Sequence, residues 1–233
     1  MKDSKPLIIA LDYADSRAAF SLLDRLDPAL CRIKIGKEMF TRYGPALVKQ
    51  VAAAGFDVFL DLKFHDIPNT VAGAVAAAAD LGAWMVNVHA SGGRAMMEAA
   101  RKALDAHPQT LLIAVTVLTS LSSDELAETG ITASAESQVL RLAALASDTG
   151  MHGVVCSARE IQPLRQRLPR DFLLVTPGIR PAGDSVGDQK RTETPANALA
   201  MGSDYLVIGR PVTQAADPLA KLQMIQQEIQ GVS

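Results

Sequence analysis

A lysine lies between two aspartates in the stretch DLKFHD at residues 61–66. The overlapping segment 58–62 consists mostly of β-forming apolar residues and predicts a short buried strand. Because side chains alternate along a strand, Asp61 and Lys63 are expected to share one of its faces. Asp66 follows where the strand ends. The sequence therefore predicts an ammonium group flanked by two carboxylates at the end of a buried strand.

Such a group of charges has two interpretations. Buried ions are costly unless they are paired, so the three residues could form a purely structural salt bridge. Perturbed charges also gather at catalytic sites, and their position in the fold decides between the two. The rest of the chain supplies that position.

Eight β-forming segments alternate with helical patterns along the chain, at the spacing of β-α units. The predicted strands are 7–11, 32–35, 58–62, 85–89, 111–117, 153–156, 173–176 and 205–208. The predicted helices are 16–26, 46–54, a helix capped by Asn69 or Thr70 that ends near Gly82, then 94–106, 134–147, 158–167, 195–201 and 218–229. This alternation predicts an α/β protein, a (β/α)8 TIM barrel in which residues 1–233 form a single domain. A doubly wound sheet is the alternative, but no Gly-x-Gly-x-x-Gly turn follows the first strand.

Polar residues gather at the C-terminal ends of the predicted strands, where barrel enzymes carry their active sites. They are Asp12, Lys34, Asp61, Lys63, His89, Thr116 or Thr119, Cys156, Ser157, Arg180 and Arg210. A structural salt bridge needs only two charged residues, so a ring of them favours a functional site. Two members have simpler interpretations: His89 as a hydrogen-bonded barrel residue, and Cys156 as a small buried hydrophobic residue.

The turns after the last two predicted strands, PGIR at 177–180 and GRP at 209–211, have the composition of a phosphate site. Their glycines permit close approach of the backbone, and Arg180 and Arg210 can each bind an oxyanion through two hydrogen bonds. Ordinary surface turns are the alternative. The polar, glycine-rich segment 181–192 next to them is long enough to be a lid over a bound ligand.

Composition excludes several classes of function. The chain has 233 residues, 48% of them apolar, and a net charge of -2, which gives no reason to expect nucleic acid or an anionic membrane as partner. Its apolar runs are too short to span a bilayer, and residues 1–6 lack a signal-peptide pattern. Two cysteines far apart in the sequence predict free thiols and a cytoplasmic location. The four histidines show no paired metal-ligand spacing.

Several motifs resemble those of the orotidine 5'-phosphate decarboxylase family in its bacterial form. They are DLKFHDIPNT at 61–70, ALD at 10–12, KIGK at 34–37, VTVLTS at 115–120, TPGIRP at 176–181 and IGRP at 208–211. The resemblance covers nearly the whole chain. It implies decarboxylation of orotidine 5'-monophosphate to uridine 5'-monophosphate in pyrimidine biosynthesis, without a metal or other cofactor.

The resemblance also implies a role for each matching residue. Lys63 would protonate C6 of the pyrimidine, and Asp61 would lie beside the departing carboxylate. Asp66 would reach the active site of a neighbouring subunit, which implies a homodimer. Lys34 would complete the catalytic group. Substrate contacts are implied for Asp12, Lys34, Asp61, Ile67, Thr70, Thr119, Arg180, Gln189, Gly209 and Arg210.

This chemistry agrees with the physical properties of the residues. A carbanion needs a nearby positive charge and then a proton, and an ammonium group between carboxylates supplies both. Two other interpretations stay open at this point. One is a metal-dependent sugar-phosphate lyase or decarboxylase of a related barrel family, which a chelator would inhibit. The other is a barrel that binds a phosphorylated metabolite without catalysis.

Overall fold

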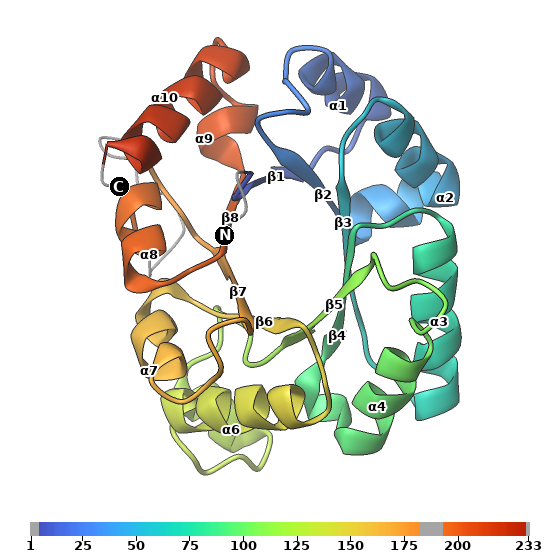
Figure 1. Cartoon of the computed structure of the whole chain (residues 1–233), viewed down its shortest axis with the longest axis vertical. Coiled ribbons are helices and arrows are strands. Elements are labelled where there is room, and N and C mark those ends of the chain that lie inside the picture. Colours follow the sequence, from blue (N-terminus) through green and yellow to red (C-terminus); the bar gives the residue numbers. More distant parts are fainter. Residues whose placement is uncertain (1–4, 182–192, 232–233) are drawn as a thin grey trace.

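The computed structural model describes residues 5–181 and 193–231, and in these ranges eight parallel strands form a closed barrel. Neighbouring strands pair in chain order, and the last strand pairs with the first. Figure 1 looks down this barrel and shows helices surrounding the strands on all sides. The strands are β1 Leu7–Leu11, β2 Arg32–Gly36, β3 Val58–Phe64, β4 Met85–His89, β5 Leu111–Val115, β6 Gly153–Val155, β7 Leu173–Pro177 and β8 Tyr205–Ile208. The predicted (β/α)8 barrel is confirmed, and the doubly wound alternative is wrong.

The helices follow the predicted order with some changes at their ends. They are α1 Ser16–Leu23, α2 Lys37–Ala53, α3 Pro68–Asp80, α4 Arg94–Lys102, α5 Ser123–Glu128, α6 Ala135–Asp148, α7 Ile161–Arg165, α8 Pro195–Met201, α9 Arg210–Thr213 and α10 Pro218–Gln230, with 3-10 turns η1 Ala90–Gly92 and η2 Ala158–Glu160. The predicted cap of α3 was wrong, because Ile67 occupies the cap position and Pro68 opens the helix. Proline suits the first helical turn, where its missing N–H leaves no hydrogen bond unmade.

Helix α2 begins earlier than the sequence indicated. It starts at Lys37, and an interruption at Gly44, with φ 60°, precedes Pro45. Glycine tolerates this backbone conformation and proline can open a new helical turn, so two short helical pieces join. The sequence pattern had revealed only the second piece.

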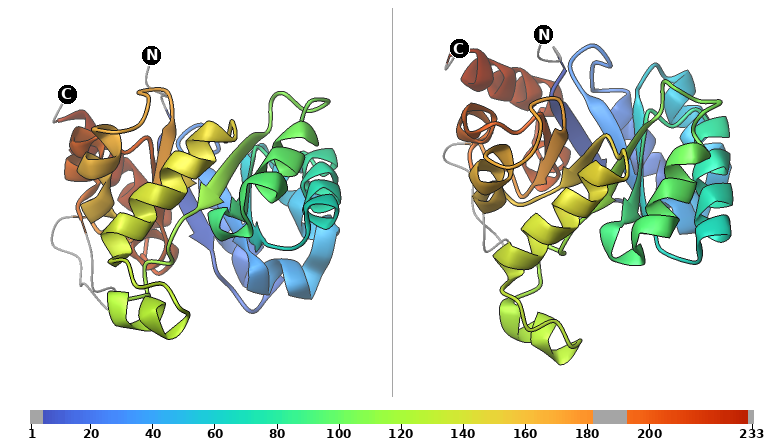
Figure 2. Two further views of the ribbon diagram at one scale, coloured as in Figure 1. Left: turned by 90° about the horizontal axis from the view of Figure 1, so that it is seen from below. Right: turned by 60° about the horizontal axis from the view of Figure 1, so that its bottom comes forward.

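Helix α5 was not predicted. A capping box starts it, in which Ser122 accepts from the Glu125 N–H and the Glu125 carboxylate accepts from the Ser122 N–H. Figure 2 shows α5, in yellow-green, projecting away from the barrel beyond one end of α6. Because this segment follows β5, it lies at the C-terminal end of the barrel, where the predicted site residues gather.

The larger apolar core lies between the barrel and its helices, and a smaller one fills the barrel interior. The buried interior residues are Ile8, Ala10, Phe59, Met85, Ile113, Val175, Tyr205 and Val207. These side chains make the barrel a packed core and not a pore. They also form the floor on which a site at the C-terminal end can be built.

Arg32, Trp84 and Tyr205 close the opposite end of the barrel. The guanidinium carbon of Arg32 lies 4.1 Å from the ring centroid of Trp84 and 5.3 Å from that of Tyr205. Arg32 Nε also contacts the Asp57 carboxylate at 3.2 Å. A pocket that enters the barrel must therefore open at its C-terminal end. Among the described residues, no helix is both long and apolar enough to cross a membrane.

Candidate active site

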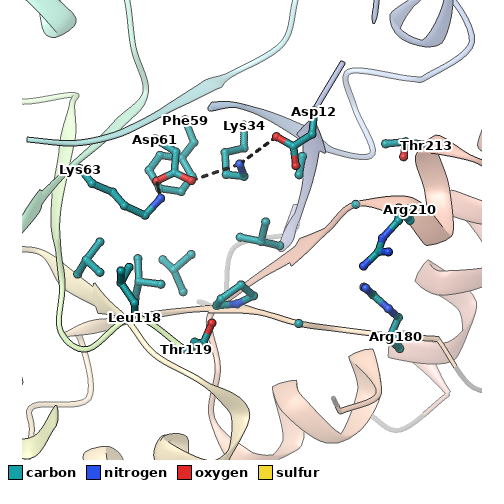
Figure 3. Close-up of a pocket in the computed structure, with 18 of the residues that line it drawn as sticks. Asp12, Lys34, Phe59, Asp61, Lys63, Leu118, Thr119, Arg180, Arg210 and Thr213 are labelled. Atoms are coloured by element: carbon teal, nitrogen blue, oxygen red, sulfur yellow. Dashed lines mark hydrogen bonds and ion pairs between the residues drawn. The ribbon is translucent and has the colours of Figure 1, made fainter. Parts of the chain in front are cut away.

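A pocket of about 540 Å³ opens at the C-terminal end of the barrel. Its lining belongs to, or closely follows, every strand except β4. Figure 3 shows charged groups on one side and a pair of arginines on another, and several valines also line the pocket. A volume of this size suits a small metabolite or nucleotide.

Four charged side chains of alternating sign form a chain along one wall of the pocket. Lys34 Nζ lies 3.6 Å from Asp12 Oδ1 and 3.2 Å from Asp61 Oδ2. Lys63 Nζ lies 2.5 Å from Asp61 Oδ1. Figure 3 shows the four side chains next to one another in the order Asp12, Lys34, Asp61, Lys63, with Lys63 reaching over the pocket. Asp61 thus binds two ammonium groups, one through each oxygen.

Asp61 keeps its negative charge in this environment. Burial raises the pKa of its carboxyl, but the charges of Lys34 and Lys63, with hydrogen bonds from Lys63 and Asn87, lower it more. The net pKa therefore lies below its ordinary value. At neutral pH the pocket presents a fixed carboxylate beside the Lys63 side chain.

The backbone conformation of Lys63 differs from that of the other residues of β3. Its φ is 54°, and it is the one non-glycine residue with positive φ in the part of the chain that the structure describes. The register between β3 and β4 shifts between Leu60 and Phe64. Asp61 and Lys63 both line the pocket, as the alternation predicted, but the regular strand geometry behind that prediction is interrupted at Lys63.

Asn87 on β4 is a functional candidate that the sequence reasoning missed. Its side chain is fully buried, accepts a hydrogen bond from the Lys63 N–H at 2.8 Å, and donates one to Asp61 Oδ1 at 2.7 Å. The sequence signal that could have revealed it is a polar asparagine between the apolar residues of a predicted buried strand. Buried amides need partners, and those partners are here two residues of the site.

Arg180 and Arg210 line the pocket beyond Lys34 and Lys63. Figure 3 shows their side chains directed toward one another. Gly178 and Gly209 line the same region, Gly178 with φ 80°, which the absence of a Cβ permits. Each guanidinium group can donate two parallel hydrogen bonds to an oxyanion. The arrangement is therefore suited to a dianionic group such as a phosphate.

Thr119 lines the pocket, whereas Thr116 is buried outside it and donates to the Val155 carbonyl at 3.2 Å. Of the two threonines, Thr119 is therefore the one placed to contact a ligand in the pocket. Much of the remaining lining is apolar, which suits a flat ring. It includes Val115, Val117, Leu118, Val155, Val175 and Val207.

Three of the expected site residues lie outside the pocket of this chain. Asp66, Ile67 and Thr70 are exposed at the junction of β3 and α3, and 67% of the Ile67 side chain is accessible. The Asp66 carboxylate accepts from the Ile67 N–H at 2.7 Å. Gln189 and the predicted lid at 182–192 lie outside the described residues.

The simpler interpretation of Cys156 is confirmed. The residue is 1% exposed, and burial raises the pKa of its thiol to about 12. His89 does not line the pocket; its ring lies 5.6 Å from that of His65, and burial, together with the charges of His65 and nearby lysines, lowers its pKa. In the described ranges, no group of three or more His, Cys, Asp or Glu side chains could hold a metal ion.

Comparison with known proteins gives consistent results. The profile described as "Orotidine 5'-phosphate decarboxylase / HUMPS family" matches residues 5–225. The orotidine 5'-phosphate decarboxylase of Shewanella sediminis is 59% identical over 229 residues, covering 97% of this chain and 98% of that protein. The protein of the same name from Chromobacterium violaceum is 61% identical, with 98% and 93% covered.

A solved structure of similar length supports the same family relationship. The orotidine 5'-phosphate decarboxylase of Lactobacillus acidophilus superimposes with a TM-score of 0.87 at 39% identity, covering 97% of this chain and 99% of that one. The likeness therefore extends over the whole barrel.

Proposed function

The chain belongs to the orotidine 5'-phosphate decarboxylase / HUMPS family, and from this premise we propose how its pocket carries out the reaction. The protein is a carboxy-lyase that converts orotidine 5'-monophosphate to uridine 5'-monophosphate in pyrimidine biosynthesis. The proposal concerns the binding mode, the residues that act and the assembly that they need. The alternating chain Asp12–Lys34–Asp61–Lys63 is the observation that carries it.

The two charged regions of the pocket orient the substrate. The phosphate dianion binds between Arg180 and Arg210, beside the turns that contain Gly178 and Gly209. The pyrimidine lies against the valines and Thr119, with C6 toward Lys63. The ribose then lies between them, next to Asp12 and Lys34.

Lys63 acts on the carbon that loses carbon dioxide. When the bond between C6 and the carboxylate breaks, its electron pair remains on C6 and carbon dioxide leaves. The ammonium group of Lys63 stabilises that negative charge and then donates a proton to C6. The resulting amine regains a proton from solvent once product has left. Asp61, 2.5 Å from Lys63 Nζ, holds the ammonium group in place.

Lys63 alone does not account for a typical enzymatic acceleration. A charge pair at 4 Å contributes about 4 kcal/mol at moderate effective dielectric. General acid catalysis contributes about 3 to 5 kcal/mol, whereas enzymes commonly lower barriers by roughly 8 to 23 kcal/mol. The difference comes from the fixed charges around Lys63 and from phosphate binding remote from the reacting carbon.

A homodimer completes the site. Asp66, Ile67 and Thr70 are exposed and outside the pocket of their own chain, as expected of residues that serve a neighbouring site. Asp66 then adds a second carboxylate near the partner's Lys63, and Ile67 and Thr70 contact the partner's substrate. Gln189 contacts the phosphate from the lid segment. We assign the enzyme to the cytoplasm, since Cys31 and Cys156 are buried free thiols; cell fractionation tests this assignment.

One assay separates this proposal from a metal-dependent reaction of a related barrel. Decarboxylation of orotidine 5'-monophosphate is followed by the change in ultraviolet absorbance of the pyrimidine, with and without EDTA. We expect equal rates in both conditions because ammonium and carboxylate groups perform every step. Loss of activity in EDTA, restored by a divalent cation, would contradict the proposal.

A further inference from the structure

Asn87 connects the two residues on which the proposed reaction depends. Its amide oxygen accepts from the backbone N–H of Lys63 at 2.8 Å, and its amide nitrogen donates to Asp61 Oδ1 at 2.7 Å. The side chain is 0% exposed, and it does not line the pocket. Asn87 therefore contacts the reacting residues without being placed to contact the substrate.

The amide replaces part of the hydrogen-bond ladder between β3 and β4. The two strands pair at Leu60 with Val86 and again at Phe64 with Val88. Between these pairs, β3 has three residues where β4 has only Asn87. A positive φ at a non-glycine residue such as Lys63 persists only where the surroundings hold it. The Asn87 oxygen supplies a partner for the N–H of that residue.

The same amide fixes the rotation of the Asp61 carboxylate. Asp61 Oδ1 accepts from both Asn87 and Lys63 Nζ, while Oδ2 faces Lys34 at 3.2 Å. We propose that Asn87 is a positioning residue for the decarboxylation, holding the Asp61 carboxylate and the Lys63 backbone so that the ammonium group is aimed at C6. The inference rests on the proposed role of Lys63 and adds a residue that acts through it.

An amide is the group that this position requires. It offers one acceptor and one donor to two fixed partners. An ionised carboxylate at residue 87 could accept from Lys63 but could not donate to Asp61, and it would repel that carboxylate. Once protonated, it could do both. An alanine leaves the Lys63 N–H without its acceptor and Asp61 Oδ1 without one of its two donors.

These differences predict distinct kinetics for two variants. Misplacement by about 1 Å in an active site can cost about 10²-fold in rate, so we expect Asn87→Ala to lower kcat by about that factor. KM and the affinity for uridine 5'-monophosphate should stay near wild type, because Arg180 and Arg210 hold the phosphate elsewhere in the pocket.

Asn87→Asp should differ from Asn87→Ala in its pH profile. At neutral pH the kcat of Asn87→Asp should be at least as low as that of Asn87→Ala. As the pH falls and the new carboxyl group takes up a proton, this kcat should rise toward the wild-type value. Asn87→Ala should show no such recovery, because it adds no titratable group; loss of the Asn87 hydrogen bond should only raise the pKa of Asp61, which weakens the enzyme further as the pH falls. Asn87 contacts Asp61 and Lys63, and Asp61 in turn contacts Lys34. His89, two residues further along β4, interacts electrostatically with His65 and Lys37. All of these titratable groups are present in both variants, so the difference reports the new carboxyl group.

Thr110→Val is the matched control. Thr110 is also buried and donates to the Ala83 carbonyl at 3.0 Å, but at the start of β5, away from the pocket. We expect this variant to lower the melting temperature and leave kcat unchanged. Asn87→Leu, which is similar in size to asparagine but can neither accept nor donate a hydrogen bond, replaces Asn87→Ala in the test if the alanine variant does not fold.

Three results would overturn the positioning role. They are a wild-type kcat in Asn87→Ala, a loss in that variant confined to KM, and an identical pH dependence in Asn87→Asp and Asn87→Ala. Lys63→Ala, measured alongside, separates this inference from its premise. Turnover retained in Lys63→Ala would refute the role of Lys63 itself. Turnover lost there but normal in the Asn87 variants would refute only the role of Asn87.

Discussion

At the scale of single residues, the site depends on one carboxylate that two ammonium groups surround. Asp61 lies 3.2 Å from Lys34 Nζ and 2.5 Å from Lys63 Nζ, and its exposure is only 9%. Removing one member of a buried ionic group leaves the others without compensation, which costs more than the intact group contributes. The charges proposed to serve catalysis therefore also affect the stability of the fold.

Asp61→Asn should destabilise the protein in a pH-dependent manner. At neutral pH we expect the free energy of unfolding to fall by about 3 kcal/mol, because two ammonium groups lose the charge between them. The folded-state pKa of Asp61 lies below its unfolded value near 3.8, so its contribution is complete above that pH. As the pH falls from 3.8 through the folded pKa, the difference between wild type and variant should shrink. Urea unfolding at a series of pH values measures it.

Asp105→Asn is the control, because Asp105 is exposed and lies 3.9 Å from Arg101. It should change the free energy of unfolding by less than about 0.5 kcal/mol. A difference between wild type and Asp61→Asn that stayed constant through the acid range would show that the Asp61 charge does not stabilise the fold.

The sequence predicted Asp61, Lys63 and Lys34 at one site because opposite charges at strand ends are conspicuous. It did not predict the role of Asn87, because a lone asparagine in an apolar strand can have its partners anywhere. Nor did it predict the positive φ of Lys63. Local propensity opposes that conformation, and the contacts that hold it come from another strand.

At the scale of elements, the strands place charge at one end of the barrel, and the turns after β7 and β8 place the two arginines of the proposed phosphate site there. The strands were predictable within about two residues, because runs of apolar β-formers end at polar residues or glycine. Helices α5 and α9 were not, since both are short and one depends on side-chain capping. The sequence predicted that Arg180 and Arg210 lie at the same end of the barrel because each follows a strand of a (β/α)8 barrel; the composition of the two turns alone would not have predicted it.

Arg210→Ala should reduce kcat/KM for orotidine 5'-monophosphate by about 10² to 10³-fold, although Arg210 lies away from Lys63. The reason is that binding energy from the phosphate is used to position the reacting ring. Steady-state kinetics with the nucleotide and with orotidine, which lacks the phosphate, measure the effect. We expect the variant and the wild type to be equally slow on orotidine.

Arg170→Ala serves as the matched control, since Arg170 is exposed in the connection before β7, at the opposite end of the barrel. It should behave as wild type with both substrates. An Arg210→Ala enzyme with near-normal kcat/KM on the nucleotide would remove the proposed phosphate site.

At the scale of the whole molecule, one end of the barrel is sealed and the other is open. Arg32 lies within 4.1 Å of the Trp84 ring centroid and contacts Asp57 and the Lys5 carbonyl. It lines no part of the pocket. The closure therefore stabilises the barrel independently of the chemistry at the other end.

Arg32→Ala should lower the free energy of unfolding by about 2 to 4 kcal/mol, because a buried cation–π contact and the ion pair to Asp57 are lost together. The melting temperature should fall by roughly 4 to 16 °C for a chain of this size. Kinetic constants of the folded fraction should not change. Arg42→Ala, which breaks an exposed pair with Glu38, should have almost no effect, and an equal shift in both variants would contradict the assignment.

Mixing two inactive variants tests whether the site is shared between subunits. Asp66→Ala and Lys63→Ala should each be nearly inactive alone. If Asp66 serves the partner's site, unfolding and refolding them together produces mixed dimers with one intact site, and activity should reappear. If Asp66 acts within its own chain, every site in the mixture lacks one residue. Activity that stayed absent, with mixed dimers demonstrated by native mass spectrometry, would refute the shared site.

The measurement that most directly tests the account is the rate of Lys63→Ala on bound substrate. Single-turnover decarboxylation at saturating enzyme gives that rate, and titration with uridine 5'-monophosphate shows whether the pocket is intact. We predict normal product affinity with a rate at least about 10⁴-fold lower, because charge stabilisation and proton donation are lost together. A rate within tenfold of wild type, with product affinity unchanged, would contradict the claim that this ammonium group carries the reaction.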